Sequence, residues 1–198
     1  WPRTIGTGAI TAAVLAAIGQ IDWNLRQMLT RELPERAPAY FFVDIQNDQI
    51  DGFRETAEAV PGVERIETAP MLRATVTAIN GRPAGEVAGG HWVVRGDRGI
   101  SHAAAQPPGT EVTQGEWWPE DHAGPPLVSF AEEEAREIGI GVGDRITVNV
   151  LGREISAEIA NLRRVEFESL GINFVMIFDS NTLAGAPQAH IATVYAGE

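Results

Sequence analysis

Histidines, serines and carboxylates are the residues that could do chemistry in this chain, and their spacing predicts no assembled active site. None of the four histidines, His91, His102, His122 and His190, lies three or four residues from another. A zinc-binding helix of the H-E-x-x-H type needs such a pair, although a zinc site assembled from distant loops stays open. The simpler interpretation places the histidines in surface loops.

The other patterns associated with catalysis or cofactor binding are also incomplete. No serine stands in a G-x-S-x-G turn, and the glycines of residues 139–143 follow a predicted helix, whereas a dinucleotide loop opens one. Asp44, Asp48 and Asp51 lack the spacing of a calcium loop. The chain has no cysteine, which excludes thiolate chemistry. We therefore expect no catalytic residue, no cofactor-binding residue, no bound metal and no cofactor.

Trp117 and Trp118 are the most conspicuous pair in the loop-rich part of the sequence. Two adjacent indoles in a loop are not easily buried together, so one is expected to pack inside while the other faces a partner or an apolar cargo. Both residues are therefore contact candidates. Plain packing of the indoles is the simpler interpretation.

Composition limits the class of protein. Apolar residues make up 44% of the 198-residue chain, which is enough for a folded core. The net charge of -12 argues against nucleic acid as a partner, because the phosphate backbone would repel it. It also argues against a polybasic attachment to anionic lipid.

The first segment has the pattern of a membrane helix that continues as a stalk. Residues 5–21 carry no charge, and Trp1 and Trp23 on either side would lie about 33 Å apart on a helix. That distance is close to the thickness of a bilayer core, so Trp1, Arg3 and Trp23 are membrane-interface candidates. An apolar seam then continues to Pro34, which ends the helix. A soluble amphipathic helix and a signal-peptide remnant are the alternatives.

A β-α-β unit is predicted after this segment. Residues 40–45 form an apolar run typical of a strand, and Asn47 or Asp48 can cap a helix through Ala59. Residues 73–79 alternate as a second strand. The unit predicts a helix packed on a sheet.

The following region, residues 83–126, is rich in glycine and proline and predicts short, irregular strands. Ser129 is placed to cap a helix over residues 130–138, and the acidic residues that follow suit its first turn. Alternation on both sides of Leu151-Gly152 predicts a hairpin. We expect strands at residues 92–94, 146–150, 155–159 and 174–178, and a last one beginning at residue 193.

Short motifs spread in order from about Asn24 to the C-terminus resemble one family. They are Glu32-Leu-Pro-Glu-Arg-Ala-Pro38, Phe41-Phe-Val-Asp-Ile45, Pro61-Gly-Val63, Trp92-Val-Val-Arg-Gly-Asp-Arg-Gly99, Trp117-Trp-Pro119, Gly124-Pro-Pro-Leu-Val-Ser-Phe130, Val142-Gly-Asp144, Asn149-Val-Leu-Gly-Arg153 and Gly171-Ile-Asn-Phe-Val175. On these motifs the chain resembles the YbbP-like permeases of the FtsX/MacB superfamily of ABC transporters.

The resemblance implies an α+β fold like the periplasmic domain of MacB. Residues 1–36 would be the end of a transmembrane helix and a stalk, and residues 37–82 a porter-type β-α-β half. Residues 83–170 would be a β-rich, Sabre-like insertion, and residues 171–198 would return to the porter part. A complete porter part would need a second β-α-β unit, so we expect this one to be incomplete at the C-terminus.

The resemblance also implies a function. The segment would project into the periplasm from the bacterial inner membrane, and a separate cytoplasmic ABC ATPase subunit would drive it. Such permeases transmit movement rather than catalyse a reaction, and export or extraction of hydrophobic or lipid-like cargo is implied. A periplasmic thioesterase or lysophospholipase is associated with some relatives. The alternatives are a periplasmic binding or assembly module without transport, and a soluble hydrolase with a dispersed site.

Overall fold

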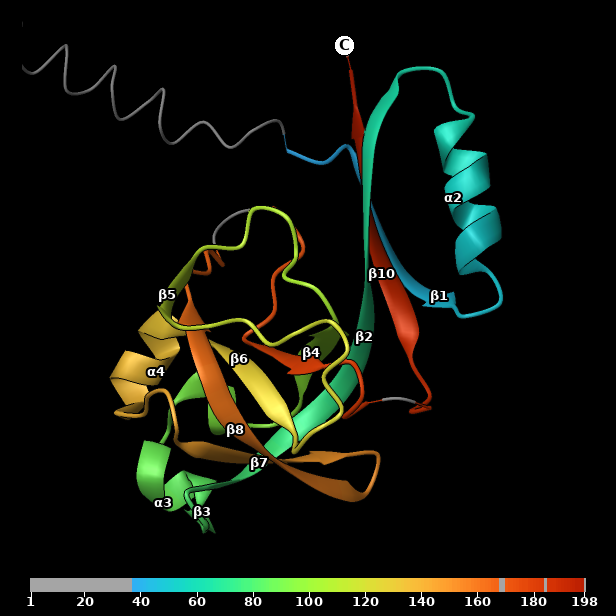
Figure 1. The fold of residues 1–198 in the computed structure, drawn as a ribbon. Coiled ribbons are helices and arrows are strands. Elements are labelled where there is room, and N and C mark those ends of the chain that lie inside the picture. Colours follow the sequence, from blue (N-terminus) through green and yellow to red (C-terminus); the bar gives the residue numbers. More distant parts are fainter. Residues whose placement is uncertain (1–36, 168–169, 184, 198) are drawn as a thin grey trace, which may run out of the picture. The chain divides into compact units, whose positions relative to one another are not determined.

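The computed structural model describes residues 37–167, 170–183 and 185–197 (Figure 1). The predicted membrane and stalk helix, with Trp1, Arg3 and Trp23, lies outside the described residues. Within the described part of the chain, no helix has the length and apolar character needed to cross a membrane.

The described residues form a mixed, sheet-rich domain. Its elements in chain order are β1 (Tyr40–Gln46), α2 (Ile50–Glu58), β2 (Val63–Ile79), β3 (Arg82–Pro83), α3 (Ala84–Ala88), the 3-10 helix η1 (Trp92–Val94), β4 (Arg98–Ala103), β5 (Val112–Gly115), β6 (Leu127–Ala131), α4 (Glu132–Ile138), β7 (Arg145–Val150), β8 (Arg153–Arg163), β9 (Met176–Asp179) and β10 (Ala189–Ala196). The expectation of an α+β fold is confirmed. The MacB-like details and the division at residues 36, 82 and 170 stay proposals.

We call β1, β10 and the first half of β2 the small sheet. β10 lies between the other two strands and pairs antiparallel with both. Helix α2 packs on this sheet, where Ile50 and Phe53 contact Ile45 and Ala192 (Figure 1). The predicted β-α-β unit at the start of the domain is therefore confirmed.

The other set of strands forms a closed ring, which we call the barrel. Each strand pairs with the next in the ring β2, β4, β9, β6, β8 and β7, and β7 pairs again with β2. Buried apolar side chains from all six strands make one core: Leu72, Ala74, Val76, Ile100, Val128, Phe130, Ile146, Val148, Ala157, Ile159, Met176 and Phe178. A closed ring leaves few free strand edges, so the barrel is protected from edge-to-edge association.

Three local predictions were wrong. Helix α2 follows Gln49 without a side-chain cap, so neither Asn47 nor Asp48 caps it. Ser129 lies inside β6, fully buried, and its hydroxyl donates to Asn161 Oδ1 at 2.5 Å instead of capping α4. Residues Trp92–Val94 form a 3-10 helix rather than a strand. For Ser129, a contact from a distant part of the chain, Asn161 of β8, favours the strand. For Trp92–Val94, the His91 side chain accepts the Val93 N–H and caps the short helix.

Two strands begin well before their predicted starts. β2 begins at Val63, ten residues before the predicted start, and β10 is already formed at Ala189. The two strands pair with each other from Val63 opposite Ala196 to Met71 opposite Ala189. Neither segment alternates clearly between apolar and polar residues, so the sequence pattern does not predict a strand there. The pairing between β2 and β10 extends both strands.

Gly115 offers a test of how tightly β5 is held against β8. Its φ is 73°, and a side chain at this position would overlap the backbone carbonyl oxygen of Ala160. Gly109 has a similar φ of 76° with open space around it. We expect Gly109→Ala to lower the free energy of unfolding by about 1 kcal/mol, the cost of a left-handed alanine. Gly115→Ala should lower it by about 1–3 kcal/mol more, because of the overlap.

Urea denaturation measures the free energy of unfolding of both variants. Both alanines carry the same backbone strain, so the difference between the two variants reports only the overlap at Gly115. Equal losses of stability would show that β5 moves away from β8 at no cost.

Candidate functional site

Trp117 and Trp118 follow β5 in the chain, and their indole rings contact each other and lie against the end of β4. Their ring centroids are 4.4 Å apart. Trp118 is buried and its Nε1 donates to the Ala103 carbonyl at 3.0 Å, while Trp117 is half-buried and donates to Ala104 at 3.3 Å. Packing accounts for Trp118. Trp117 keeps an accessible face and stays a proposed contact residue.

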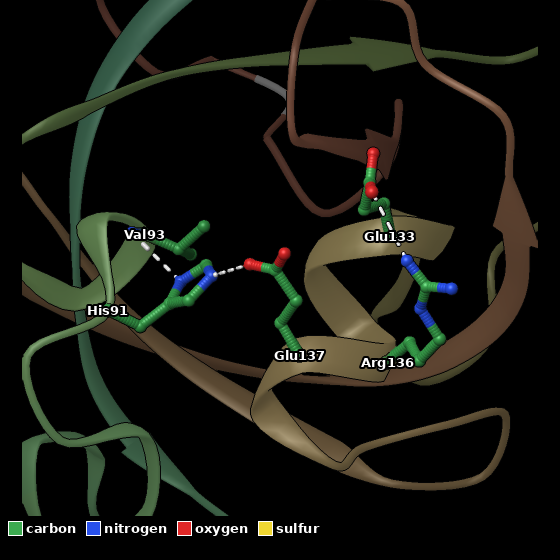
Figure 2. A network of polar contacts seen from close by, with 5 residues as sticks. All are labelled: His91, Val93, Glu133, Arg136 and Glu137. Carbon is green, nitrogen blue, oxygen red and sulfur yellow. Dashed lines mark hydrogen bonds and ion pairs between the residues drawn. The ribbon is translucent and has the colours of Figure 1, made fainter.

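His91 meets a carboxylate, the arrangement that would favour a hydrolase (Figure 2). Its Nε2 lies 2.8 Å from Glu137 Oε2 on α4. Its Nδ1, however, accepts the backbone N–H of Val93 at 3.3 Å, which assigns the proton to Nε2. Both ring nitrogens are thus occupied. The bond holds η1 against α4, while the Arg136–Glu133 pair of the same helix lies away from His91.

Two residues of opposite charge are buried in the described domain, Glu134 of α4 and Arg163 of β8. Burial raises the pKa of Glu134, and its neighbours Glu133 and Glu137 add to this effect. Burial lowers the pKa of Arg163 to about 10, while Glu134 opposes that shift. Arg163 donates to the Phe174 carbonyl, but its Nη1 and Glu134 Oε2 have no hydrogen-bond partner. The charge of Glu134 thus favours the charged form of Arg163 without a direct hydrogen bond between the two side chains.

His102 and His190 lie near each other where the small sheet meets the barrel. His102 Nε2 is 2.7 Å from Gln188 Oε1, and its Nδ1 is 3.2 Å from Ser180 Oγ. A serine, a histidine and an amide resemble a catalytic triad in composition, but a neutral amide cannot stabilise the imidazolium that a carboxylate would. The arrangement therefore does not favour nucleophilic catalysis.

The prediction that the histidines lie in surface loops was wrong for two of the four. His102 and His190 are half-buried in strands, and His190 bonds Asn47 at 2.9 Å. His122 is in a loop and donates to the Pro125 carbonyl at 2.9 Å. Among the described residues, no three His, Cys, Asp or Glu side chains gather in a way that could hold a metal ion.

Strand β1 carries the largest run of exposed apolar side chains. Tyr40, Phe41, Phe42 and Val43 are 39–65% exposed, and Phe42 makes an edge contact with Phe53 of α2. β1 ends the strand order of the described residues, next to β10. Among the described residues, no strand pairs with its outer edge.

The two ends of the described domain lie side by side. The Ala39 N–H donates to the Val194 carbonyl at 2.8 Å, and Tyr40 lies opposite Val194 in the sheet. Since β1 and β10 are antiparallel, the chain reaches and leaves the domain at the same end of the small sheet.

Sequence reasoning missed the buried charges. The pairing of β8 with β6 shifts register between Ile159 and Asn161, so that Ile159 and Leu162 both join the core. Simple alternation along the strand therefore does not mark Arg163 as buried. Nor does the pattern mark Glu134, which is one of three consecutive glutamates at the start of α4.

In sequence, the chain is similar to the permease subunit of an ABC transporter. The relative is the uncharacterized ABC transporter permease YbbP of Escherichia coli strain K12, which is 26% identical over 188 residues. The expected resemblance to this kind of permease is confirmed. The match takes in 93% of this chain but 22% of the relative, so the chain spans about a fifth of the relative's length.

No protein-family profile matches the chain. Among solved structures, a permease-protein domain from Porphyromonas gingivalis is similar at 15% identity with a TM-score of 0.40, over 73% of this chain and 66% of that one. A score this low supports no argument about function.

The stability of the domain should fall in mild acid because of His190. Burial, then Arg54 and His102, lower the pKa of His190, while Asp51 opposes them. The folded state thus holds this histidine neutral, and the unfolded state binds its proton more readily. The contribution is present above the usual pKa of about 6.5 and is lost as pH falls below it.

We expect His190→Asn to flatten the decrease in unfolding free energy between pH 7 and pH 5, measured by urea denaturation. His122→Asn, in a loop outside this cluster, is the matched control and should keep the wild-type slope. An unchanged slope in His190→Asn would contradict the assignment.

The Glu134–Arg163 interaction can be measured by a double-mutant cycle. Glu134→Gln leaves Arg163 buried without a nearby opposite charge, and Arg163→Met does the same to Glu134. The double variant should therefore lose less stability than the sum of the two single losses. We expect a coupling of about 1–2 kcal/mol in the free energy of unfolding. Strict additivity would show that the two charges do not act on each other.

Proposed function

We propose that this chain is the extracytoplasmic domain of a permease subunit of an ABC transporter and has no catalytic activity of its own. The observation that carries the proposal is the similarity to YbbP along 93% of the chain, within a relative more than four times as long. The chain then corresponds to one portion of a permease. The hydrogen bonds that occupy the rings of His91 and His102 support a role other than catalysis.

The position of the domain ends supports an insertion between two membrane helices. A domain inserted in this way needs its first and last strands close together, as Ala39 and Val194 are. In the proposed arrangement the segment before β1 comes from the inner membrane, and the chain beyond β10 leads back to it. Trp1, Arg3 and Trp23 are then proposed to lie at the membrane interface.

The exposed residues of β1 suit the proposed MacB-like porter part. A second β-α-β unit, as the resemblance implies, would pair with the outer edge of β1 and cover Tyr40 to Val43. Aromatic and β-branched side chains on a strand are stabilised by such cross-strand neighbours. This would bury apolar surface that the described residues leave in contact with water.

The proposed mechanism is mechanical. A cytoplasmic ABC ATPase subunit hydrolyses ATP, the attached membrane helices move, and the domain shifts between two positions. Hydrophobic or lipid-like molecules are the proposed cargo, with Trp117 as a proposed contact. A periplasmic thioesterase or lysophospholipase is a proposed partner.

Labelling of single cysteines tests the location of the domain, since residues 1–198 contain no cysteine. Leu151 is 69% exposed at the tip of the β7–β8 hairpin, and Phe178 is fully buried. In spheroplasts that express the full-length protein, free of other cysteines, a membrane-impermeant maleimide should label Leu151→Cys. Phe178→Cys should stay unlabelled until the protein is unfolded.

Labelling of Leu151→Cys only after lysis would contradict the extracytoplasmic location. Co-purification of an ABC ATPase with the full-length protein is expected in the same membranes. Recovery of a periplasmic enzyme with no ATPase would instead favour the assembly module without transport, and ATP hydrolysis by the chain alone would overturn the non-catalytic role.

A further inference from the structure

The described chain passes between the small sheet and the barrel at two places. The first crossing lies inside β2, which pairs with β10 up to Met71 and with β4 from Leu72. The second is the connector from Ser180 to Gln188, which joins β9 of the barrel to β10 of the small sheet. Any rotation of the small sheet against the barrel must bend β2 and displace this connector.

Two consecutive residues of β4 bind both crossings. Ser101 is 3% exposed, and its hydroxyl donates to the Pro70 carbonyl of β2 at 2.7 Å, one residue before Met71. The ring of His102 reaches Ser180 at 3.2 Å with Nδ1 and Gln188 at 2.7 Å with Nε2. His102 thus ties together the two ends of the connector, while its neighbour holds the strand.

We propose that Ser101 and His102 form a clasp that fixes the angle between the small sheet and the barrel. Successive side chains of a strand point to opposite faces, so one short segment of β4 can reach both crossings. The role of this clasp in a permease rests on the proposed function. In a permease, it makes the barrel follow the small sheet when the membrane helices move.

Other contacts at this junction do not replace the clasp. Asp179 accepts the Thr182 N–H at 2.9 Å and so shapes the first turn of the connector. Leu183 is buried in the barrel core. Both anchor the start of the connector to the barrel, whereas the His102 ring also holds Gln188, the residue just before β10.

Distances between two spin labels test the clasp in the full-length protein with no other cysteine. Glu58→Cys on α2 reports the small sheet and Arg153→Cys on β8 reports the barrel, both at exposed positions. We expect one narrow distance distribution in the unmodified background. Ser101→Ala with His102→Ala should broaden it at least twofold, and an unchanged width in a folded double variant would overturn the proposal.

Two further variants separate the clasp from general destabilisation. Ser101→Thr keeps the hydroxyl and should keep the narrow distribution, and His122→Ala removes a histidine that bonds only within its own loop in the described structure. Broadening in either variant would count against the clasp. If the double variant does not fold, hydrogen exchange in His102→Ala alone decides: faster exchange confined to β10 and the connector supports the clasp, and uniform acceleration overturns it.

These measurements need no transport and no ATPase. A broadened distribution in a protein that binds no ATPase would refute the proposed function and leave the clasp standing. An unchanged distribution in the double variant of an ATPase-bound permease would refute the clasp and leave the proposed function standing.

Discussion

The 17-residue strand β2 is the constraint on which the rest of the described domain depends. Up to Met71 it pairs with β10, and from Leu72 it pairs with β4 and β7. Since side chains alternate between the faces of a strand, a slip by one residue would turn its buried side chains to the wrong side. The small sheet and the barrel therefore share one register, and neither can shift its pairing along β2 independently of the other.

Elements stabilised by neighbours close in sequence were predictable, and the β7–β8 hairpin is the clearest example. Its residues alternate between buried and half-exposed, and Leu151 and Gly152 form the turn with φ of 50° and 87°. Both angles are left-handed, as a tight hairpin turn requires. The order β1, α2 and β2 was also predictable, from the apolar run of β1, the helical spacing of α2 and the alternation in the second half of β2. Trp117 and Trp118 were singled out by residue type alone, and a contact role for Trp117 stays a prediction.

Features stabilised by distant segments were not predictable in the same way. Ser129 precedes acidic residues as a helix cap would, yet its buried bond to Asn161 of β8 favours a strand. The first half of β2 contains Pro70, a residue that usually argues against a strand. Its carbonyl accepts the Ser101 hydroxyl, and only the folded barrel brings that hydroxyl near. The same holds for His102, whose partners come from the connector some 80 residues away.

Polar side chains of the interior tie separate segments of the described domain together. Ser101, Trp118 and Arg163 all donate to backbone carbonyls of other segments: Pro70, Ala103 and Phe174. A buried donor satisfied by a carbonyl fixes the backbone at that place. In the proposed permease, a load on the joined ends of β1 and β10 passes through their shared ladder into β2. The interior bonds then make the barrel move as one body.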